Sequence, residues 1–267
     1  MNIFRKYKLL LPLIICAAIT LCMGLFLLTM GGEEGRETDT ETETDPLETE
    51  EPIMENPIFK TDLSAYEVYM DVPSGSRLLL VNKQNLLESD DVPGDLVAVK
   101  DTWKDITLDR TAEMALEAMF IEMRAAGYAN VFVTSAYRSY AYQSSLFNTY
   151  IGEEMAKNPS LTRAEAKEKV LRYSAYPGTS EHQTGLCVDL MVNGMAELDE
   201  SFANYPVYEW LRENAWKFGF ILRFPEDKVA ITGYDFEPWH YRFVGRYDAY
   251  RIHSAGLCLE EYVEQLK

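Results

Sequence analysis

Positively charged residues are scarce in this chain of 267 residues. Lys and Arg together number 25, against 43 Asp and Glu, which leaves a formal net charge of -18 at pH 7. A chain this acidic repels the phosphates of nucleic acids and of anionic lipid headgroups. We therefore expect no nucleic-acid partner.

Compositional extremes and internal repeats are also missing. Hydrophobic residues make up 47% of the chain and charged residues 25%, which excludes a wholly disordered or fibrous protein. Cysteine is rare, with four in the chain. Cys16 and Cys22 lie in an apolar N-terminal stretch, and Cys187 and Cys258 are far apart in the sequence. An extracellular location permits a disulfide, but we expect both of the latter to be free thiols.

Charge is absent from the 22 residues between Leu9 and Met30. At about 1.5 Å per residue a helix of this length spans about 33 Å, enough to cross a bilayer. Arg5, Lys6 and Lys8 precede the stretch and acidic residues follow it, a bias that places the N-terminus in the cytoplasm and the rest outside. We expect an uncleaved, single-pass transmembrane anchor within residues 1–30.

Two other kinds of N-terminal segment fit the sequence less well than the anchor. A cleaved signal peptide has a shorter apolar region and an A-x-A-like site, and no such site occurs from Thr29 to Gly35. A lipoprotein anchor needs a small residue before its cysteine, whereas Ile15 and Leu21 precede the two cysteines here.

Residues 31–57 have almost no apolar side chains, and contain eleven acidic residues and one base, Arg36. Such a segment cannot bury enough surface to offset its ordering entropy, so it is typical of an extended tether. From Ile58 onward, about 210 residues of globular composition suffice for one core. The predicted organisation is an anchor (1–30), an acidic tether (31–57) and one folded domain (58–267).

Short apolar runs alternate irregularly with helical patterns in the folded part. Asp109 is a candidate N-cap, and Thr162 with Glu165 forms a capping-box pattern. The patterns predict strands at 77–81, 96–99, 130–134, 185–192, 220–224 and 240–244, and helices at 109–126, 140–157, 162–173, 205–218 and 259–266. These strands and helices do not alternate with regular βαβ spacing. The pattern therefore favours an α+β fold with a mixed, largely antiparallel sheet and flanking helices.

Candidate chemistry concentrates in two segments, PGTSEHQTGLCVDL (177–190) and GYDFEPWHYRFVG (233–245). The first contains His182 and Asp189, and the second contains Glu237 and His240 in an E-x-x-H spacing. Two imidazoles and a carboxylate can form a catalytic zinc site, and a further carboxylate can transfer a proton. The same spacings also fit a hydrogen-bonded surface pair of His and Glu, and a capping role for Asp189. The spacings alone therefore do not decide whether the segments form a zinc site.

Both segments resemble the signatures of the VanY-type zinc D-alanyl-D-alanine carboxypeptidases, within the lysostaphin/D-Ala-D-Ala/hedgehog-like metallopeptidase superfamily. SAYRSYAYQSSLFNTY (135–150) is similar to a third signature, and FGFILRFPEDKVAITGYDFEPWH leads into the second in the same way. The entry LLLVNKQNLLESDDVPGDLV is also similar. The resemblance covers roughly residues 78–264 and is highly specific.

This resemblance implies one Zn²⁺, held on the sheet by His182, Asp189 and His240. Glu237 would act as general base and then as general acid. Arg138 would stabilise the developing oxyanion or grip the terminal carboxylate of the substrate, tasks that suit a planar guanidinium.

Two further residues, Gln143 and Ser180, occupy motif positions that would line the substrate pocket. A helix-surface role for the first and a loop-capping role for the second are equally open. Cys187 stands where the family more often has a small residue, and by strand alternation it shares a face with Asp189.

The function implied by the resemblance is a membrane-tethered zinc carboxypeptidase that removes the C-terminal D-alanine from peptidoglycan stem peptides. We expect a monomer with its catalytic domain on the cell-wall side of the membrane. An L,D-carboxypeptidase acting on tetrapeptide stems is one alternative. A non-catalytic protein that binds the cell wall is another, but the three metal ligands, Glu237 and Arg138 are all present.

The anchor and tether are predicted to be dispensable for catalysis, because the acidic segment has no means of packing on a core. A chain that begins at Ile58 should fold and should cleave soluble peptides at the rate of the full chain. Comparing the two rates on one soluble peptide checks this. Loss of cleavage in the shorter chain would show that the tether contributes to the site.

Overall fold

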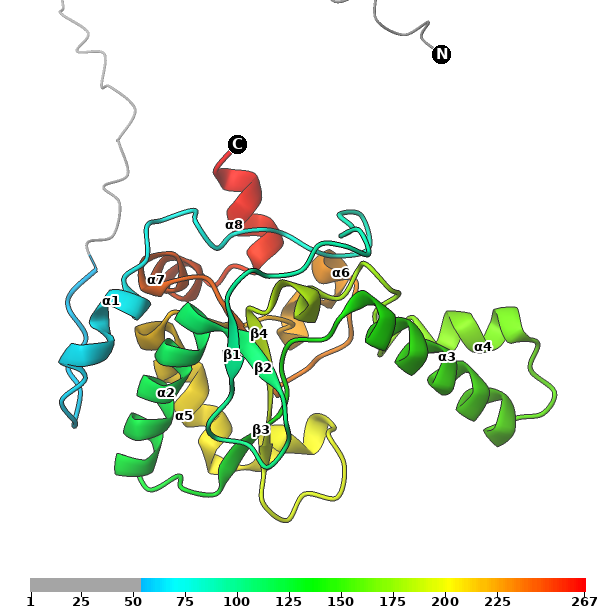
Figure 1. Ribbon diagram of the computed structural model, residues 1–267, viewed down its shortest axis with the longest axis horizontal. Helices are drawn as coiled ribbons and strands as arrows, with labels where there is room; N and C mark the ends of the chain where they lie inside the picture. Colours follow the sequence, from blue (N-terminus) through cyan, green and yellow to red (C-terminus); the bar gives the residue numbers. More distant parts are fainter. Residues whose placement is uncertain (1–53) are drawn as a thin grey trace, which may run out of the picture. The chain divides into compact units, whose positions relative to one another are not determined.

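Two antiparallel sheets organise the part of the chain that the computed structural model describes, residues 54–267 (Figure 1). The larger sheet has four strands in the order β3-β4-β6-β5, and the smaller pairs β1 with β2. The strands are β1 (Leu96–Ala98), β2 (Thr107–Asp109), β3 (Val131–Ser135), β4 (Cys187–Val192), β5 (Phe220–Leu222) and β6 (His240–Phe243). The predicted α+β class is confirmed, but all strand pairs of the described residues are antiparallel, so the sheet is not mixed as predicted.

The α-helices flank the larger sheet, and α2, α3, α4 and α8 begin at side-chain caps. They are α1 (Glu67–Met70), α2 (Arg110–Ala125), α3 (Tyr140–Lys157), α4 (Arg163–Val170), α5 (Pro206–Asn214), α6 (Val229–Thr232), α7 (Arg246–Ala255) and α8 (Leu259–Gln265). The Asp109 side chain accepts hydrogen bonds from the first turn of α2, and Thr162 with Glu165 forms the predicted capping box.

Alternation along β4 and β6 separates an apolar face from a polar one. Val188, Leu190, Tyr241 and Phe243 face the main core, together with buried side chains of α2 and α5. The intervening residues 187, 189, 240 and 242 therefore face the opposite side of the sheet. That side contains the polar site described below.

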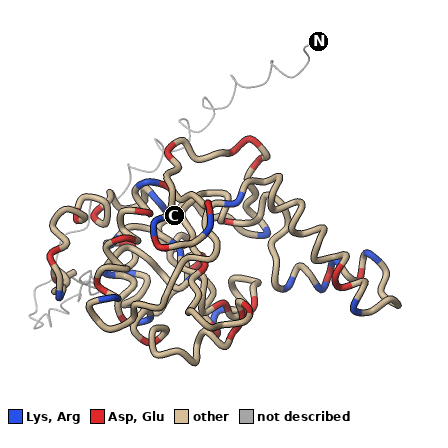
Figure 2. The backbone as a smooth tube through the Cα atoms, turned by 60° about the horizontal axis from the view of Figure 1, so that its bottom comes forward, with Lys and Arg blue, Asp and Glu red and all other residues tan. Residues whose placement is uncertain are grey.

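Two smaller hydrophobic cores contain side chains of α7 and α8, and of α3 and α4. Side chains of α7 and α8 pack with Ile221 and Val244. The hairpin of α3 and α4 has its own core around Phe147 and Val170, and it extends to one side of the unit in Figure 1. Both signs of charge occur on this hairpin (Figure 2), where Glu154 pairs with Lys157 and Lys169.

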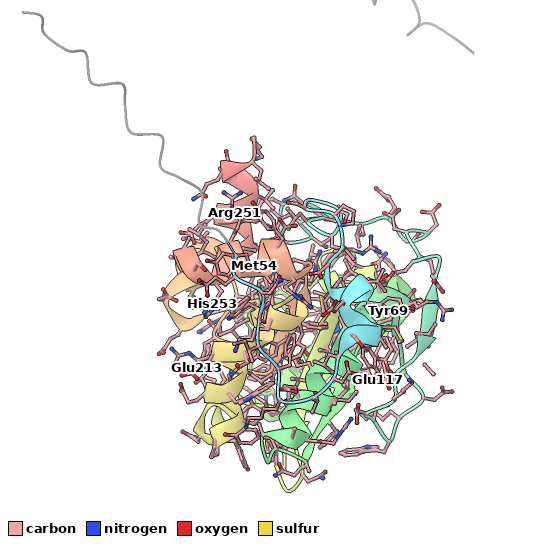
Figure 3. All side chains as sticks on the ribbon, turned by 90° about the vertical axis from the view of Figure 1, so that its left-hand side faces the viewer. Met54, Tyr69, Glu117, Glu213, Arg251 and His253 are labelled. Carbon is pink, nitrogen blue, oxygen red and sulfur yellow. The ribbon has the colours of Figure 1, made fainter. Side chains whose placement is uncertain are left out.

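The start of the described segment is fixed to α2 and to the main core. The buried Glu122 carboxylate accepts hydrogen bonds from the backbone of Lys60 and Thr61. Phe59 packs against Phe218, with their ring centroids 5.3 Å apart. Figure 3 views this side of the domain, with Tyr69 on α1 above Glu117 on α2.

Several sequence predictions are wrong in detail. Residues 77–81 form no strand, because the carbonyls of Arg77 and Leu79 accept hydrogen bonds from the Arg242 side chain instead of a neighbouring strand. The predicted helix 162–173 ends at Val170, and the last turn of the predicted helix 205–218 is a 3₁₀ helix, η4 (Ala215–Phe218). Helix α7 and strand β2 were not predicted.

The N-terminal predictions lie almost wholly outside the described residues. The transmembrane anchor within 1–30 and most of the tether within 31–57 fall there. Between residues 54 and 267, no helix has the length and apolar character needed to cross a membrane.

Candidate active site

A cavity of about 470 Å³ opens over the polar face of the sheet. Six of the seven predicted site residues line it: Arg138, Ser180, His182, Asp189, Glu237 and His240. Tyr150 of α3 and Tyr173, which follows α4, extend the wall away from the sheet. The helical hairpin therefore forms one side of the cavity.

Three elements bring the predicted metal ligands together. His182 lies on a short 3₁₀ helix, η2 (Glu181–Thr184), Asp189 on β4, and His240 at the start of β6. Asp189 and His240 are directly paired across the two strands. Asp189 Oδ2 lies 3.3 Å from His182 Nε2, and Asp189 Oδ1 lies 3.1 Å from His240 Nδ1.

These separations suit a tetrahedral zinc ion. Ligand atoms at about 2.1 Å from zinc stand about 3.4 Å apart when the coordination is tetrahedral. His182 Nε2 and Asp189 Oδ1 are also buried without a hydrogen-bond partner among the described residues. The donor set of two imidazoles and one carboxylate leaves a fourth position for water or substrate, as in catalytic zinc sites.

The ring of His182 is fixed by the backbone. Its Nδ1 lies 2.6 Å from the carbonyl oxygen of Ala136, so this nitrogen carries the proton and donates it. The lone pair is then on Nε2, the nitrogen that faces Asp189. The sequence therefore folds to present His182 to a metal through Nε2.

The electrostatics of the cavity favour a cation at this place. Burial by itself would raise the pKa of Asp189, but His182 and His240 hold it well below its usual range. Burial raises the pKa of Glu237 to about 7, against the opposing effect of His240 and with a further contribution from Asp189. Glu237 Oε2 lies 3.5 Å from His240 Nδ1, so its carboxylate borders the proposed metal position.

Arg138 follows β3 and points its charge into the cavity. Its backbone N–H donates to the carbonyl of His182, which fixes the two segments together. Its Nε is buried and has no hydrogen-bond partner within residues 54–267. This guanidinium is therefore available to an anionic ligand.

The two predicted pocket residues differ in their positions. Ser180 is buried and lines the cavity directly. Gln143 does not line it: its side-chain amide donates to the carbonyl of Ala175, a residue of the cavity wall. Gln143 therefore supports the wall from behind.

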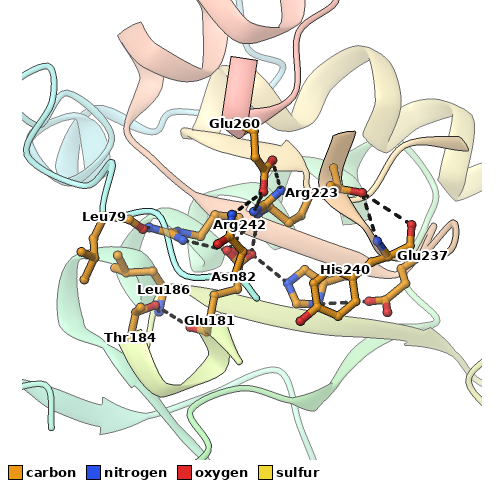
Figure 4. Close-up of polar contacts among 12 residues, drawn as sticks. Leu79, Asn82, Glu181, Thr184, Leu186, Arg223, Glu237, His240, Arg242 and Glu260 are labelled. Atoms are coloured by element: carbon orange, nitrogen blue, oxygen red, sulfur yellow. Dashed lines mark hydrogen bonds and ion pairs between the residues drawn. The ribbon is translucent and has the colours of Figure 1, made fainter. Parts of the chain in front are cut away.

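Four charged residues at the base of the site were missed by the sequence analysis: Glu181, which also lines the cavity, and Arg223, Arg242 and Glu260 (Figure 4). Arg223 and Arg242 lie within the predicted strands FILRF and HYRFV, and both are 0% exposed. A charge within a buried strand pattern signals a buried partner, and this was the available clue. Nothing in the sequence identified the two glutamates as those partners.

The two cysteines of the described segment, Cys187 and Cys258, are free and buried, which confirms the expectation of free thiols. Cys187 lies opposite Arg242 on the polar face of the sheet, close enough to Glu181 and His240 to form a second possible ligand cluster. Burial raises the pKa of the Cys187 thiol, which keeps it protonated. The two arginines that contact Glu181 also oppose a second cation there.

Comparisons with known proteins give a consistent result. The family model VanY, D-alanyl-D-alanine carboxypeptidase, matches residues 105–246. A D-alanyl-D-alanine carboxypeptidase of Enterococcus faecalis is 39% identical over 191 residues, which span 71% of this chain and 66% of that protein. The chain thus covers just under two thirds of this relative.

Solved structures extend the similarity to the fold. A vancomycin-resistance D,D-pentapeptidase VanY in complex with Zn(II) has a TM-score of 0.60 at 38% identity, covering 70% of this chain and 98% of that one. VanYB in complex with D-alanine-D-alanine gives 0.61 at 39%, covering 72% and 99%. The LD-carboxypeptidase LdcB gives 0.61 at 38%, covering 70% and 86%.

The donor set predicts one zinc ion per folded domain. Elemental analysis of protein purified without added metal should give close to one zinc per chain. His182→Ala should lower the occupancy sharply, because it removes one of three protein ligands. His253→Ala is the matched control, since this histidine stacks on Trp216 outside the cavity and its loss should leave zinc unchanged. Full zinc occupancy in His182→Ala would contradict the ligand assignment.

Proposed function

The chain belongs to the VanY family of D-alanyl-D-alanine carboxypeptidases, and on that premise we propose that it removes the C-terminal D-alanine from peptidoglycan stem peptides. It is a zinc-dependent carboxypeptidase by family and by its donor set. One observation carries the proposal: the metal donors, the Arg138 guanidinium, whose buried Nε has no hydrogen-bond partner among the described residues, and a carboxylate with a raised pKa border the same cavity.

We assign the zinc ligands to His182 Nε2, Asp189 and His240 Nδ1, on the distances given above. A zinc ion held by these residues would supply Lewis-acid chemistry: polarisation of the scissile carbonyl and a lower pKa for a bound water molecule. The buried walls of the cavity strengthen each of these electrostatic effects, because little bulk water screens them.

Glu237 is proposed to move the proton. As a carboxylate beside the metal position, it takes a proton from the attacking water and returns it to the leaving amine. Its pKa of about 7 suits both roles, because a general base and acid works best when its pKa is near the ambient pH.

Arg138 is proposed to bind the free carboxylate at the end of the substrate. A guanidinium can donate two parallel hydrogen bonds to a carboxylate, and this one has a buried Nε without a partner in the described segment. Stabilisation of the developing oxyanion is its alternative role. Ser180 would contact the substrate directly, and Gln143 would act by supporting the wall at Ala175.

The location is proposed from the N-terminal sequence. An anchor within residues 1–30 would hold the catalytic domain, 58–267, on the cell-wall side of the membrane as a monomer. The tether of 27 residues, 31–57, would reach at most about 90 Å when fully extended. The enzyme would therefore act on wall peptides close to the membrane.

A second candidate activity is an L,D-carboxypeptidase that acts on tetrapeptide stems. The similarity to the LD-carboxypeptidase LdcB supports this second activity. Its sequence identity of 38% and TM-score of 0.61 are within 1% and 0.01 of the values for the two VanY structures. Both activities use the same zinc chemistry and differ in the residue on the amino side of the bond.

Purified protein incubated with tripeptide, tetrapeptide and pentapeptide stems tests the choice. The proposal predicts that the pentapeptide loses one D-alanine, as identified by mass, while the tetrapeptide is cleaved slowly. Fast cleavage of the tetrapeptide would establish the L,D-activity in its place. No cleavage of any stem by zinc-loaded protein would contradict both activities.

Replacement of Glu237 by Gln should abolish turnover while zinc is retained. Gln is nearly isosteric but cannot transfer a proton, so kcat should fall by about two orders of magnitude or more. Glu226→Gln removes an exposed carboxylate of the preceding segment and should keep normal kcat. Steady-state kinetics with zinc analysis checks both variants, and undiminished kcat in Glu237→Gln would refute the proton-transfer role.

Recognition of a free C-terminus by Arg138 predicts that an amidated peptide is not cleaved. Arg138→Lys should also be severely impaired with normal zinc content, because a point charge cannot reproduce bidentate geometry. Arg172→Lys, with a side chain 75% exposed, is the matched control. Efficient cleavage of the amidated peptide would point to an endopeptidase, and full activity of Arg138→Ala would assign the residue to structure.

A further inference from the structure

The two ring nitrogens of His240 have different partners. Nδ1 lies 3.1 Å from Asp189 Oδ1, on the side of the cavity. Nε2 lies 3.3 Å from Oε1 of Glu181, whose side chain is 2% exposed and lies beneath the site. An uncharged imidazole carries one proton, so whichever partner accepts that proton decides which nitrogen can bind a metal.

Glu181 is held in place by two buried arginines. Its Oε2 accepts hydrogen bonds from Arg223 Nε at 3.0 Å and from Arg242 Nη1 at 2.8 Å. These contacts set two fixed guanidinium charges against the buried carboxylate, which offsets the cost of burying its negative charge. The carboxylates of Asp189 and Glu237 lie beside Nδ1, whereas Glu181 is the carboxylate beside Nε2, so Glu181 is the acceptor for the His240 Nε2–H.

The network continues to the C-terminal helix. Arg223 donates to both oxygens of Glu260 on α8, at 2.8 and 2.6 Å (Figure 4). Arg242 donates to the backbone carbonyls of Arg77 and Leu79, at 2.9 Å each. Segments from both ends of the folded domain, outside the family match of 105–246, thus converge beneath the metal ligand.

We infer that Glu181 is a positioning residue, which accepts the Nε2–H of His240 and so directs its Nδ1 lone pair toward the zinc. Glu260 on α8 keeps Glu181 in place through Arg223, so the C-terminal helix contributes to zinc affinity. The inference rests on the zinc ligands of the proposed function. It also implies that the two zinc-binding histidines use opposite nitrogens, because the Ala136 carbonyl fixes His182 for binding through Nε2.

The competing account is that the four charges only stabilise the fold. Breaking a buried ion pair is costly whether or not a metal site lies nearby, so a loss of stability cannot separate the two accounts. The ring nitrogen that carries the proton and the intrinsic zinc affinity of the folded protein can separate them.

Nitrogen-15 NMR of the zinc-loaded full chain tests the first consequence without any variant. The chain has three histidines, so the ring signals can be assigned by replacing His253 and by their couplings. The expected result is a protonated Nε2 with a metal-bound Nδ1 for His240, and the reverse for His182. Zinc bound through Nε2 of His240 would overturn this inference but not the proposed function, whereas absence of zinc would overturn both.

Zinc affinity measured by competition with a chelator tests the second consequence. Loss of a partner that orients a metal ligand costs about 10- to 100-fold in affinity, and Glu181→Gln should fall in that range. Glu260→Gln should weaken zinc by about tenfold, since Gln cannot form the same bidentate ion pair with Arg223. Glu264→Gln removes an exposed charge from the same helix and should leave the affinity unchanged.

Thermal unfolding of the metal-free variants provides the control for folding. If Glu181→Gln does not fold, Glu260→Gln decides the matter, because that variant still contains the Glu181 carboxylate. The folded Glu260→Gln variant could bind zinc as tightly as the wild type and differ only in a lower unfolding temperature. That result would show that the network is purely structural and would overturn the proposal.

Discussion

The pairing register of β4 and β6 is the constraint on which the rest of the site depends. It sets Asp189 opposite His240 and Cys187 opposite Arg242 on the polar face of the sheet. A slip of one residue would turn Asp189 into the main core and bring Val188 or Leu190 to the cavity. Each buried apolar side chain on the other face contributes about 1.5–3 kcal/mol, so hydrophobic burial under α2 and α5 also maintains the geometry of the metal ligands.

Electrostatic balance beneath the sheet is the second requirement. Two arginines and two glutamates are brought together almost completely out of water, and unpaired burial of any one of them would be strongly unfavourable. Equal numbers of each sign and nearly saturated hydrogen bonds offset that cost. The arrangement requires residues from η2, β6, α8 and the segments that follow β5 and α1, so the site is complete when the whole domain has folded.

Local patterns were the part of the fold that the sequence predicted well. The caps at Asp109 and Thr162, and the apolar runs in VFVTS and CVDLMV, depend on neighbours within a few residues, and these elements occur where expected to within two residues. Residues 77–81 have the same apolar character, but two of their carbonyls accept hydrogen bonds from a side chain of β6 and not from a neighbouring strand. These partners are far apart in the sequence, so no local pattern predicts the contact. The segment 246–255 was not recognised as helix α7, although Ala249 and Ile252 are buried at helical spacing.

The residues of the candidate site were likewise predicted only in part. His182, Asp189, Glu237 and His240 stood out because titratable residues were concentrated in two short segments, and the structure places them around one cavity. Glu181 and Glu260 were missed because a glutamate beside a histidine, or on a terminal helix, is ordinary in an acidic chain. Their importance comes from partners 37 to 61 positions away, which no local pattern encodes.

Anomalous X-ray diffraction at the zinc edge, from crystals of the zinc-loaded protein, tests the central claim most directly. The account predicts one strong peak per chain, within about 2.0–2.2 Å of His182 Nε2, an Asp189 oxygen and His240 Nδ1, with Glu237 beside it but not bound. A peak bound by Glu181 and Cys187, or direct coordination by Glu237 in place of Asp189, would contradict it.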